Sequence, residues 1–366
     1  MNVAKRLKST RVSMGLTQKQ VTERCGIDDS SLSAFENGRS EPRFSQLAKL
    51  AELYHVSVAY FFREEAHHAQ VVMWRSKPER RRELEAEFLQ LCRQYRMLEL
   101  WTNEVTDKRL PELDDRRSDF FSYRQAIEMA SKARDMMGLG QRPGESLYRV
   151  LDEVFGVKIF ALELDNKGVA ACVVSEEFGT GILLNRNCVR WRRNYDLAHE
   201  LFHLLTWARF GHGEDVCRPR AEEEKLANCF AAHLLLPSET VRSAIFKVVH
   251  NNNKGSFEKL DQVAREFDVS LEALLWRMHY LFNWKELDTN GFIKEAKEYI
   301  KAAPRRDDSR PPGLPERYVA LASMAVRHGD ISLGRFAKIV GIGRREAELY
   351  TTGREPDYGE VPIPAV

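Results

Sequence analysis

A histidine pair at helical spacing is the first feature of the sequence that suggests chemistry. Residues 197–205 read Leu-Ala-His-Glu-Leu-Phe-His-Leu-Leu, are mostly apolar and lack glycine and proline, which predicts a helix. At about 3.6 residues per turn, His199 and His203 lie on one face, close enough to hold one zinc ion. Glu200 stands beside them, where its carboxylate can polarise a water molecule. A metal-dependent peptide hydrolase needs this arrangement.

The third protein ligand must come from elsewhere in the chain. A hydrolytic zinc site uses three protein ligands and keeps a fourth position open. Residues 222–237 predict a second long helix, which begins with Glu222, Glu223 and Glu224 and is stopped by a proline. In hydrolases of the His, His, Glu type the third ligand comes from such a following helix. Spacing alone does not decide which of the three glutamates is the third zinc ligand. The alternative is that none of them binds metal and that they form a solvated acidic helix start.

Composition limits the class of protein. A chain of 366 residues with 43% hydrophobic residues is expected to form about two or three domains with apolar cores. Its net charge is only +2, so nucleic-acid binding must depend on a local patch. Apolar runs fall well short of the roughly 18 residues that span a bilayer, and the N-terminus does not resemble a signal peptide. We expect a cytoplasmic protein without membrane partners.

The cysteines agree with a reducing compartment. Six are present without a Cys-x-x-Cys pair, at positions 25, 92, 172, 188, 217 and 229. Cys217 and Cys229 flank the acidic cluster near the histidine pattern and are conceivable metal ligands. Neither has a partner at zinc-finger spacing, so isolated thiols are the preferred interpretation.

The first 62 residues contain several short helical patterns separated by caps and glycines. Thr17 is an expected N-cap, and glycines at positions 26 and 38 close two of the helices. A helix of about eight residues, a short glycine-containing turn and a second helix form the helix-turn-helix layout. We therefore expect residues 1–66 to form a helix-turn-helix domain of five helices.

This segment resembles the lambda Cro/repressor-type helix-turn-helix family, also called XRE. The resemblance rests on residues 15–18, 33–42 and 47–56. In that family the second helix of the motif lies in the major groove of double-stranded DNA. The resemblance implies base-edge contacts from serines, base or phosphate contacts from a glutamine, and phosphate contacts from basic residues: Ser30, Ser31, Ser33, Gln18, Lys19 and Arg39.

Two aspartates in this second helix argue against strong base readout. Asp28 and Asp29 precede short serines, where arginine, asparagine or glutamine would read bases better. The alternative is a module that only dimerises or binds a peptide, and we keep a homodimer open.

Residues 67–118 predict a linker strand and helix. Gln70 to Arg75 has a strand's composition, and Pro78 precedes a charged run. From Leu84 to Leu100 apolar residues recur at helical spacing between glutamates and arginines, which indicates a linker helix with a solvated face.

Three short strands are expected just before the histidine helix. They lie at residues 157–162, 169–174 and 181–185, after helices near 121–137 and 147–155. An edge of their sheet could hold an extended peptide by strand addition and present its carbonyl to the metal.

This region resembles the ImmA/IrrE family of zinc metallopeptidases from about residue 120 to 285. The resemblance rests on Ala198-His-Glu-x-x-His203, on Glu224-x-x-Ala-Asn228-x-Phe-Ala-Ala-x-Leu-Leu-x-Pro237 and on a helical pair within 256–285. It implies an α+β, zincin-like (HExxH) peptidase domain over 119–300, with Zn2+ held by His199, His203 and Glu224 and with Glu200 as the catalytic base. Phe202 departs from the family's small residue, and we expect it to point into the core.

Two further residues are candidates to stabilise an oxyanion, Tyr195 and His212. Loop histidines and helix-start tyrosines are more often structural, and this reading stays open for both. A charged, proline-rich linker then leads to residues 313–355, which predict a C-terminal helical domain resembling a second helix-turn-helix.

The whole chain is thus expected to be multidomain, mainly α with a small β-sheet. The resemblance implies a regulatory endopeptidase that cuts a protein substrate, a helix-turn-helix repressor or a toxin or antitoxin partner, in stress response or prophage control. The alternative is a DNA-binding transcriptional regulator or antitoxin whose peptidase-like domain only binds a partner.

Overall fold

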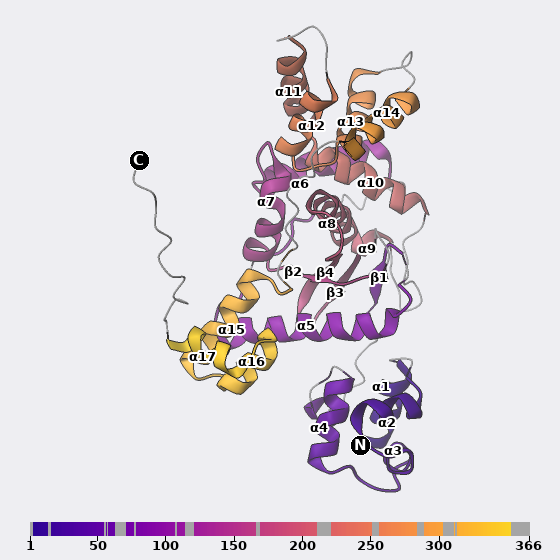
Figure 1. Ribbon diagram of the computed structural model, residues 1–366, viewed down its shortest axis with the longest axis vertical. Coiled ribbons are helices and arrows are strands. Elements are labelled where there is room, and N and C mark those ends of the chain that lie inside the picture. The colour runs from indigo at the N-terminus through magenta and orange to yellow at the C-terminus, as the bar shows by residue number, and fades with distance from the viewer. Residues whose placement is uncertain are drawn as a thin grey trace.

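The fold is mainly helical and is arranged around one small sheet (Figure 1). The computed structural model describes the chain except for residues 1–2, 14–15, 55, 57, 63–70, 77, 107, 114–120, 166–168, 211–220, 251–255, 284–288, 303–310, 312 and 353–366. In the described part, no helix combines the length and the apolar character needed to cross a membrane. The expected fold class, mainly α with a small sheet, is confirmed.

The N-terminal domain has its own apolar core, built from Leu7, Val21, Leu32 and Leu50 among others. Its elements are α1 (Val3–Ser13), α2 (Gln18–Cys25), α3 (Asp29–Glu36), α4 (Phe44–Leu53) and the 3-10 helix η1 (Val58–Phe62). The fifth expected helix is therefore a short 3-10 helix. Thr17 caps α2 through a reciprocal hydrogen bond with the third helical residue, as the sequence predicts.

The sheet has four strands in the order β1-β3-β4-β2. The strands are β1 (Val72–Trp74), β2 (Lys158–Leu162), β3 (Ala171–Ser175) and β4 (Gly179–Asn185). β3 pairs antiparallel with both β1 and β4, whereas β2 pairs parallel with β4. The linker interpretation of residues 67–118 needs correction, because β1 from that segment joins the expected three strands at the edge of the sheet.

Successive side chains of each strand point to opposite faces of the sheet and are buried in two separate apolar cores. Ile159, Cys172 and Ile182 face one core, which is formed with α6 (Tyr123–Met136), α7 (Pro143–Arg149), α8 (Arg190–Leu205) and α10 (Ala221–Leu235). Phe160 and Leu183 face the other, which includes α5 (Arg81–Thr102), α15 (Glu316–His328) and α16 (Leu333–Val340).

α5 is therefore part of the sheet's packing and is not a linker helix with a mainly solvated face. Phe88, Cys92 and Tyr95 on α5 are fully buried against the sheet. The interleaved charges that suggested solvation lie partly at this buried interface, where Glu99 pairs with Lys158 at 3.0 Å and with Arg317 of α15 at 2.7 Å.

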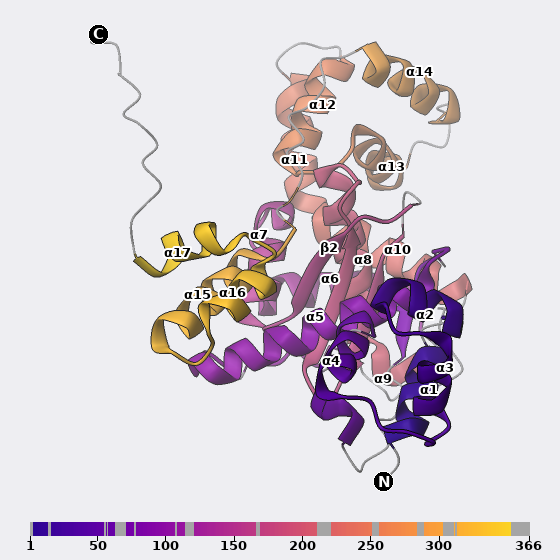
Figure 2. The same ribbon diagram turned by 60° about the horizontal axis from the view of Figure 1, so that its bottom comes forward.

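The C-terminal helices lie beside one end of α5 in both ribbon views (Figures 1 and 2). α16 ends at Gly341, whose φ of 74° suits glycine, and α17 (Arg344–Thr352) follows as in a helix-turn-helix. The remaining helices are the π-helix η2 (Val150–Val154), α9 (Trp207–Phe210), α11 (Ser238–His250), α12 (Phe257–Glu266), α13 (Leu271–Phe282) and α14 (Thr289–Ala302).

Candidate metal centre

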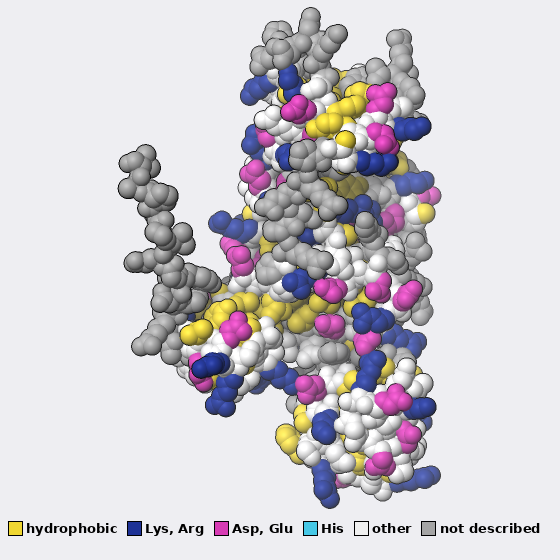
Figure 3. Space-filling view, viewed as in Figure 1, with side chains coloured by type: hydrophobic (Ala, Val, Ile, Leu, Met, Phe, Trp, Pro, Cys, Tyr) yellow, Lys and Arg dark blue, Asp and Glu magenta, His cyan; other side chains and the backbone are white. Residues whose placement is uncertain are grey.

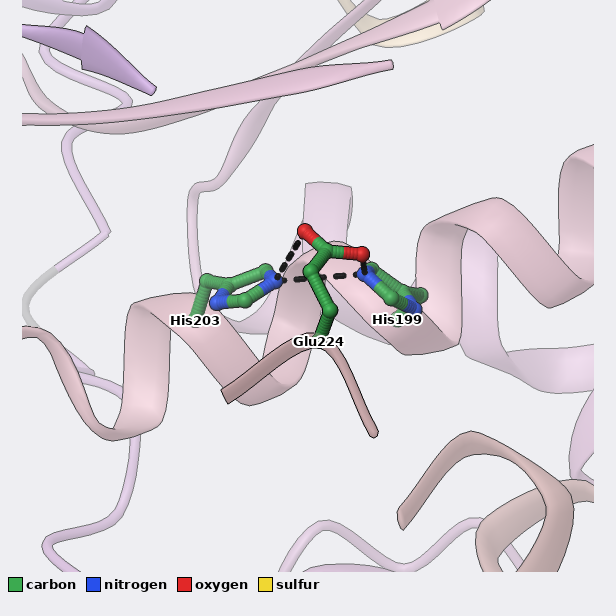
Figure 4. Close-up of side chains that lie close together, drawn as sticks. All are labelled: His199, His203 and Glu224. Atoms are coloured by element: carbon green, nitrogen blue, oxygen red, sulfur yellow. Dashed lines mark hydrogen bonds and ion pairs between the residues drawn. The ribbon is translucent and has the colours of Figure 1, made fainter. Parts of the chain in front are cut away.

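Two helices bring two histidines and one glutamate together (Figure 4). His199 and His203 are one turn apart on α8, and Glu224 lies in the first turn of α10. The Nε2 atoms of the two histidines are 3.2 Å apart. The Glu224 carboxylate oxygens lie 3.3 Å from Nε2 of His199 and 3.8 Å from Nε2 of His203. One potential ligand atom from each residue lies within 4.8 Å of the others, as a shared cation requires.

The opposite nitrogen of each imidazole has an acceptor partner. Nδ1 of His199 is 3.1 Å from Oδ1 of Asn228, and Nδ1 of His203 is 2.8 Å from Oε1 of Glu223. An amide oxygen and a carboxylate only accept, so both Nδ1 atoms are assigned the ring proton. Both Nε2 atoms then present lone pairs to one another and to a carboxylate. In this tautomer neither Nε2 carries a hydrogen to share, and a cation between the two nitrogens and the carboxylate would satisfy all three groups.

The electrostatics of the group also suit a cation. Burial lowers the pKa of His199 to about 4, which keeps its imidazole neutral near pH 7. Burial alone would raise the pKa of Glu224, but the contacts with His199 and His203 lower it below its ordinary value. Oε1 of Glu224 is buried and has no hydrogen-bond partner in the described part of the chain. A neutral imidazole and an ionised carboxylate are the protonation states that a metal ligand needs.

Glu200 is oriented toward the sheet, where it neighbours the Cys172 thiol of β3. It is 1% exposed, and within the described residues its Oε1 has no hydrogen-bond partner. Burial raises the pKa of this carboxyl to about 8. A group with a pKa near neutrality can both accept and return a proton, which is the property required of a general base.

The other residues singled out around the centre have different surroundings. The Tyr195 hydroxyl donates to Oδ1 of Asn228 at 2.9 Å, which gives it a positioning contact. His212 lies outside the described residues, as does Cys217. Phe202 is fully buried and packs against Phe230, so it points into the core as expected. The exposed Glu222 and the His203-bound Glu223 do not reach the Nε2 atoms as Glu224 does.

The expected DNA contacts are spread over α2, α3 and the following turn. Lys19, Ser30 and Arg39 are exposed, whereas Ser31, Ser33 and Gln18 are half-buried. The Gln18 amide donates to Glu36 at 2.9 Å, beside the Arg11–Glu36 ion pair inside the domain, so its nitrogen already has an intramolecular partner.

The start of α3 carries negative charge. Hydrogen bonds from Ser30 and Ser31 lower the pKa of Asp28 to about 2, so this N-cap stays ionised. Charges of both signs are interspersed on the visible face of the domain (Figure 3). This pattern favours modest rather than strong attraction to DNA phosphates.

Sequence reasoning missed three supporting residues. Glu223 was considered only as an alternative ligand, yet it orients His203. Asn228 was part of the quoted pattern, and its position one turn after Glu224 was the available signal. Arg75 donates to Asp196 and Asn228 and lies 3.8 Å from the Glu224 carboxylate. No local sequence pattern around Arg75 predicts these contacts.

Glu223→Ala should lower the free energy of unfolding of the metal-free protein by about 1–3 kcal/mol, because it leaves the buried Nδ1–H of His203 without its acceptor. Glu223→Gln retains an acceptor oxygen and should cost less. Chemical denaturation of both variants measures this, with Glu222→Ala on the exposed neighbour as control. Equal stability of Glu223→Ala and the parent would contradict the assigned contact.

Two family models match the chain. A helix-turn-helix model matches residues 7–61, and a model described as IrrE N-terminal-like domain, of a peptidase family, matches residues 152–279. Both agree with the resemblances drawn from the sequence, which are thereby confirmed.

Individual relatives match the N-terminal domain. The HTH-type transcriptional regulator ImmR of Bacillus subtilis is 40% identical over 60 residues, 16% of this chain and 47% of that protein. The HTH-type transcriptional regulator PuuR of Escherichia coli is 37% identical over 60 residues, 16% of this chain and 32% of PuuR. The match thus spans less than half of the length of these curated relatives.

Two solved structures align along most of the chain but not closely. They are Bacillus thuringiensis PlcR in complex with the peptide PapR7 and DNA, and ComR from Streptococcus suis. Each is 14% identical over 96% of this chain and 94% of its own, with a TM-score of 0.17, which is too low to carry an argument. The family matches stand without them: residues 7–61 are similar to a helix-turn-helix family and residues 152–279 to the IrrE N-terminal-like family, and His199, Glu200, His203 and Glu224 all lie in the second match.

Proposed function

We propose that this protein is a zinc-dependent regulatory endopeptidase that its helix-turn-helix domain brings to DNA. One observation carries the proposal. Two imidazole Nε2 atoms and a Glu224 carboxylate oxygen converge in a buried site, while the opposite ring nitrogens are bound to Asn228 and Glu223. This is the donor set of a hydrolytic zinc site with an open fourth position.

Each residue of the centre has a separate task in peptide hydrolysis. His199, His203 and Glu224 hold the ion, and zinc, when bound, supplies Lewis acidity at the reacting oxygen atoms. Glu200 takes a proton from the attacking water and later returns it to the leaving amine. Its buried carboxyl, with a pKa of about 8 in the metal-free protein, is suited to this exchange. Asn228 and Glu223 keep the imidazoles in the tautomer that can bind zinc.

The substrate is a protein segment in an extended conformation. β1 is an edge strand, and no described strand pairs with its outer side. The residue after β1, Arg75, reaches the ligand Glu224 at 3.8 Å, so this edge ends at the metal centre. Val72, Met73 and Trp74 of β1 are at most 2% exposed, so strand addition here requires that the atoms covering this edge move aside; a peptide paired with β1 would then present a scissile carbonyl to the ion. The tethered DNA-binding domain favours a selective substrate in the cytoplasm, such as a helix-turn-helix repressor or a toxin or antitoxin partner.

Glu200→Gln should keep zinc and lower the rate of substrate cleavage by at least about 100-fold, because the amide cannot accept the proton. Zinc content and cleavage of the repressors encoded beside the gene are measured on the same preparation, with the exposed Glu222→Gln as a matched control. Cleavage by Glu200→Gln at the parent rate would refute the role assigned to Glu200.

A second candidate function is a DNA-binding transcriptional regulator or antitoxin whose peptidase-like domain binds a partner without cutting it. The match of the first domain to named transcriptional regulators favours it. Under this function, Glu200→Gln would leave regulation of the target promoter unchanged. Under the peptidase function, the same substitution abolishes the response.

The helix-turn-helix domain should bind double-stranded DNA with an affinity that falls steeply as salt rises, because phosphate contacts release counterions. Lys19→Ala and Arg39→Ala should each weaken binding on all sequences and reduce the slope of log affinity against log salt by about 1. Fluorescence anisotropy of labelled DNA with the full chain measures this, and the exposed Lys132→Ala on α6 is the control. An unchanged slope in both variants would remove these residues from the interface.

A further inference from the structure

Arg75 approaches the metal centre from outside the matched peptidase domain. It directly follows β1, and its backbone N–H donates to Ala170 at 3.1 Å, which continues the pairing with β3. The preceding Trp74 is fully buried, and its indole N–H donates to Glu85 of α5 at 2.7 Å. The backbone at Arg75 is therefore fixed on both sides, by the sheet and by α5.

The guanidinium of Arg75 contacts three groups around the ligands. Nη1 is 2.7 Å from Oδ1 of Asp196, and Nη2 is 3.3 Å from Oδ1 of Asn228. Nε is 3.8 Å from Oε2 of the ligand Glu224. The planar, rigid arrangement of guanidinium donors allows one side chain to reach all three, which a lysine cannot do.

Asn228 is the critical partner of Arg75, because its side-chain amide can present either its oxygen or its NH2 group to His199. Its oxygen accepts from Nη2 of Arg75 and from the Tyr195 hydroxyl at 2.9 Å, and it also faces Nδ1 of His199. Two other donors thus hold the oxygen, and not the NH2 group, toward His199. If the amide turned over, its NH2 group would donate to Nδ1, and the ring proton would move to Nε2, where it blocks metal binding.

We infer that Arg75 is a positioning residue of the metal centre: it fixes the Asn228 amide, and thereby the His199 tautomer, and it orients the Glu224 carboxylate. The inference rests on the proposed zinc site. It also means that a residue N-terminal to the family match, which begins at residue 152, helps to position ligands that lie within it. Trp74, which precedes Arg75, contacts Glu85 in the first turns of α5. Glu83 in the same turns forms an ion pair with Arg24 of the helix-turn-helix domain at 2.8 Å.

The chain offers a matched control in Arg192. Arg192 also pairs with Asp196, at 3.0 Å, and its guanidinium lies 5.7 Å from the Tyr195 ring centroid, against 5.8 Å for Arg75. In contrast to Arg75, no contact of Arg192 with Asn228 or Glu224 is present among the described residues. If zinc affinity fell only because Asp196 had lost a positively charged neighbour, it would therefore fall in both Arg75→Gln and Arg192→Gln.

The test measures zinc affinity of the full-length protein by competition with a chromophoric chelator. Arg75→Gln should weaken zinc binding by about 10–100-fold, as is typical for a group that orients a ligand. Arg75→Lys keeps a charge beside Asp196 and the fold, but it cannot span both partners and should recover only part of the affinity. Arg192→Gln should remain within a few-fold of the parent.

A second readout does not depend on metal. Nitrogen NMR of the histidine rings in the zinc-free protein should show His199 protonated at Nδ1 in the parent and in Arg192→Gln, and a mixture of tautomers in Arg75→Gln. Parental zinc affinity and parental tautomer in both Arg75 variants would overturn the inference, as would an equal loss in Arg192→Gln. If circular dichroism shows that Arg75→Gln is unfolded, the zinc affinity and the His199 tautomer of Arg75→Lys decide the test. A parent protein that binds no zinc would instead refute the proposed function.

Discussion

The central physical constraint is the facing pair of imidazole lone pairs on α8. With the ring protons on Nδ1, the Nε2 atoms lie 3.2 Å apart and neither can donate to the other, and both rings are almost completely buried from water. Leaving buried acceptors without partners is costly, so the arrangement favours strong partners on the outer nitrogens and suits a cation between the inner ones. α10 supplies the outer partners and the carboxylate from residues 223, 224 and 228, which lie on little more than one turn.

The rest of the fold can be understood as support for this crossing of α8 and α10. α8 packs on one face of the sheet, and α10 packs on α8. The strands carry apolar side chains on both faces, so the opposite face must also be covered. α5 and the C-terminal helices cover it, and the buried Glu99–Lys158–Arg317 contacts join them to β2. The C-terminal helices thus share a core with the sheet although their order resembles a second helix-turn-helix.

The sequence predicts those site residues and helix caps whose positions depend only on spacing along one helix. The placement of His199, Glu200 and His203 on one helix follows from the helical repeat, and Phe202 takes the core position that its apolar side chain suggests. Glu224 required a family resemblance, because helix spacing does not tell which of three adjacent glutamates faces a neighbouring helix. Thr17 was predictable as a cap for the same local reason as the histidines.

Long-range pairing set the limits of sequence reasoning. β1 joins β3, about a hundred residues later in the chain, so neither its place at the sheet edge nor the reach of Arg75 leaves a local pattern. In α5, glutamates and arginines between apolar residues suggested a solvated helix, yet Glu99 is buried because Lys158 and Arg317 neutralise it from other elements. Partners distant in sequence decide burial in both cases.

The most direct measurement of the central claim is zinc K-edge X-ray absorption on the purified full-length protein supplied with one equivalent of zinc. A shell of nitrogen and oxygen atoms at about 2.0–2.1 Å, with the scattering pattern of two imidazoles and without sulfur, is the predicted result. A zinc–sulfur distance near about 2.3 Å, which would implicate a cysteine such as Cys172 or Cys229, or zinc that stays unbound, would contradict the account.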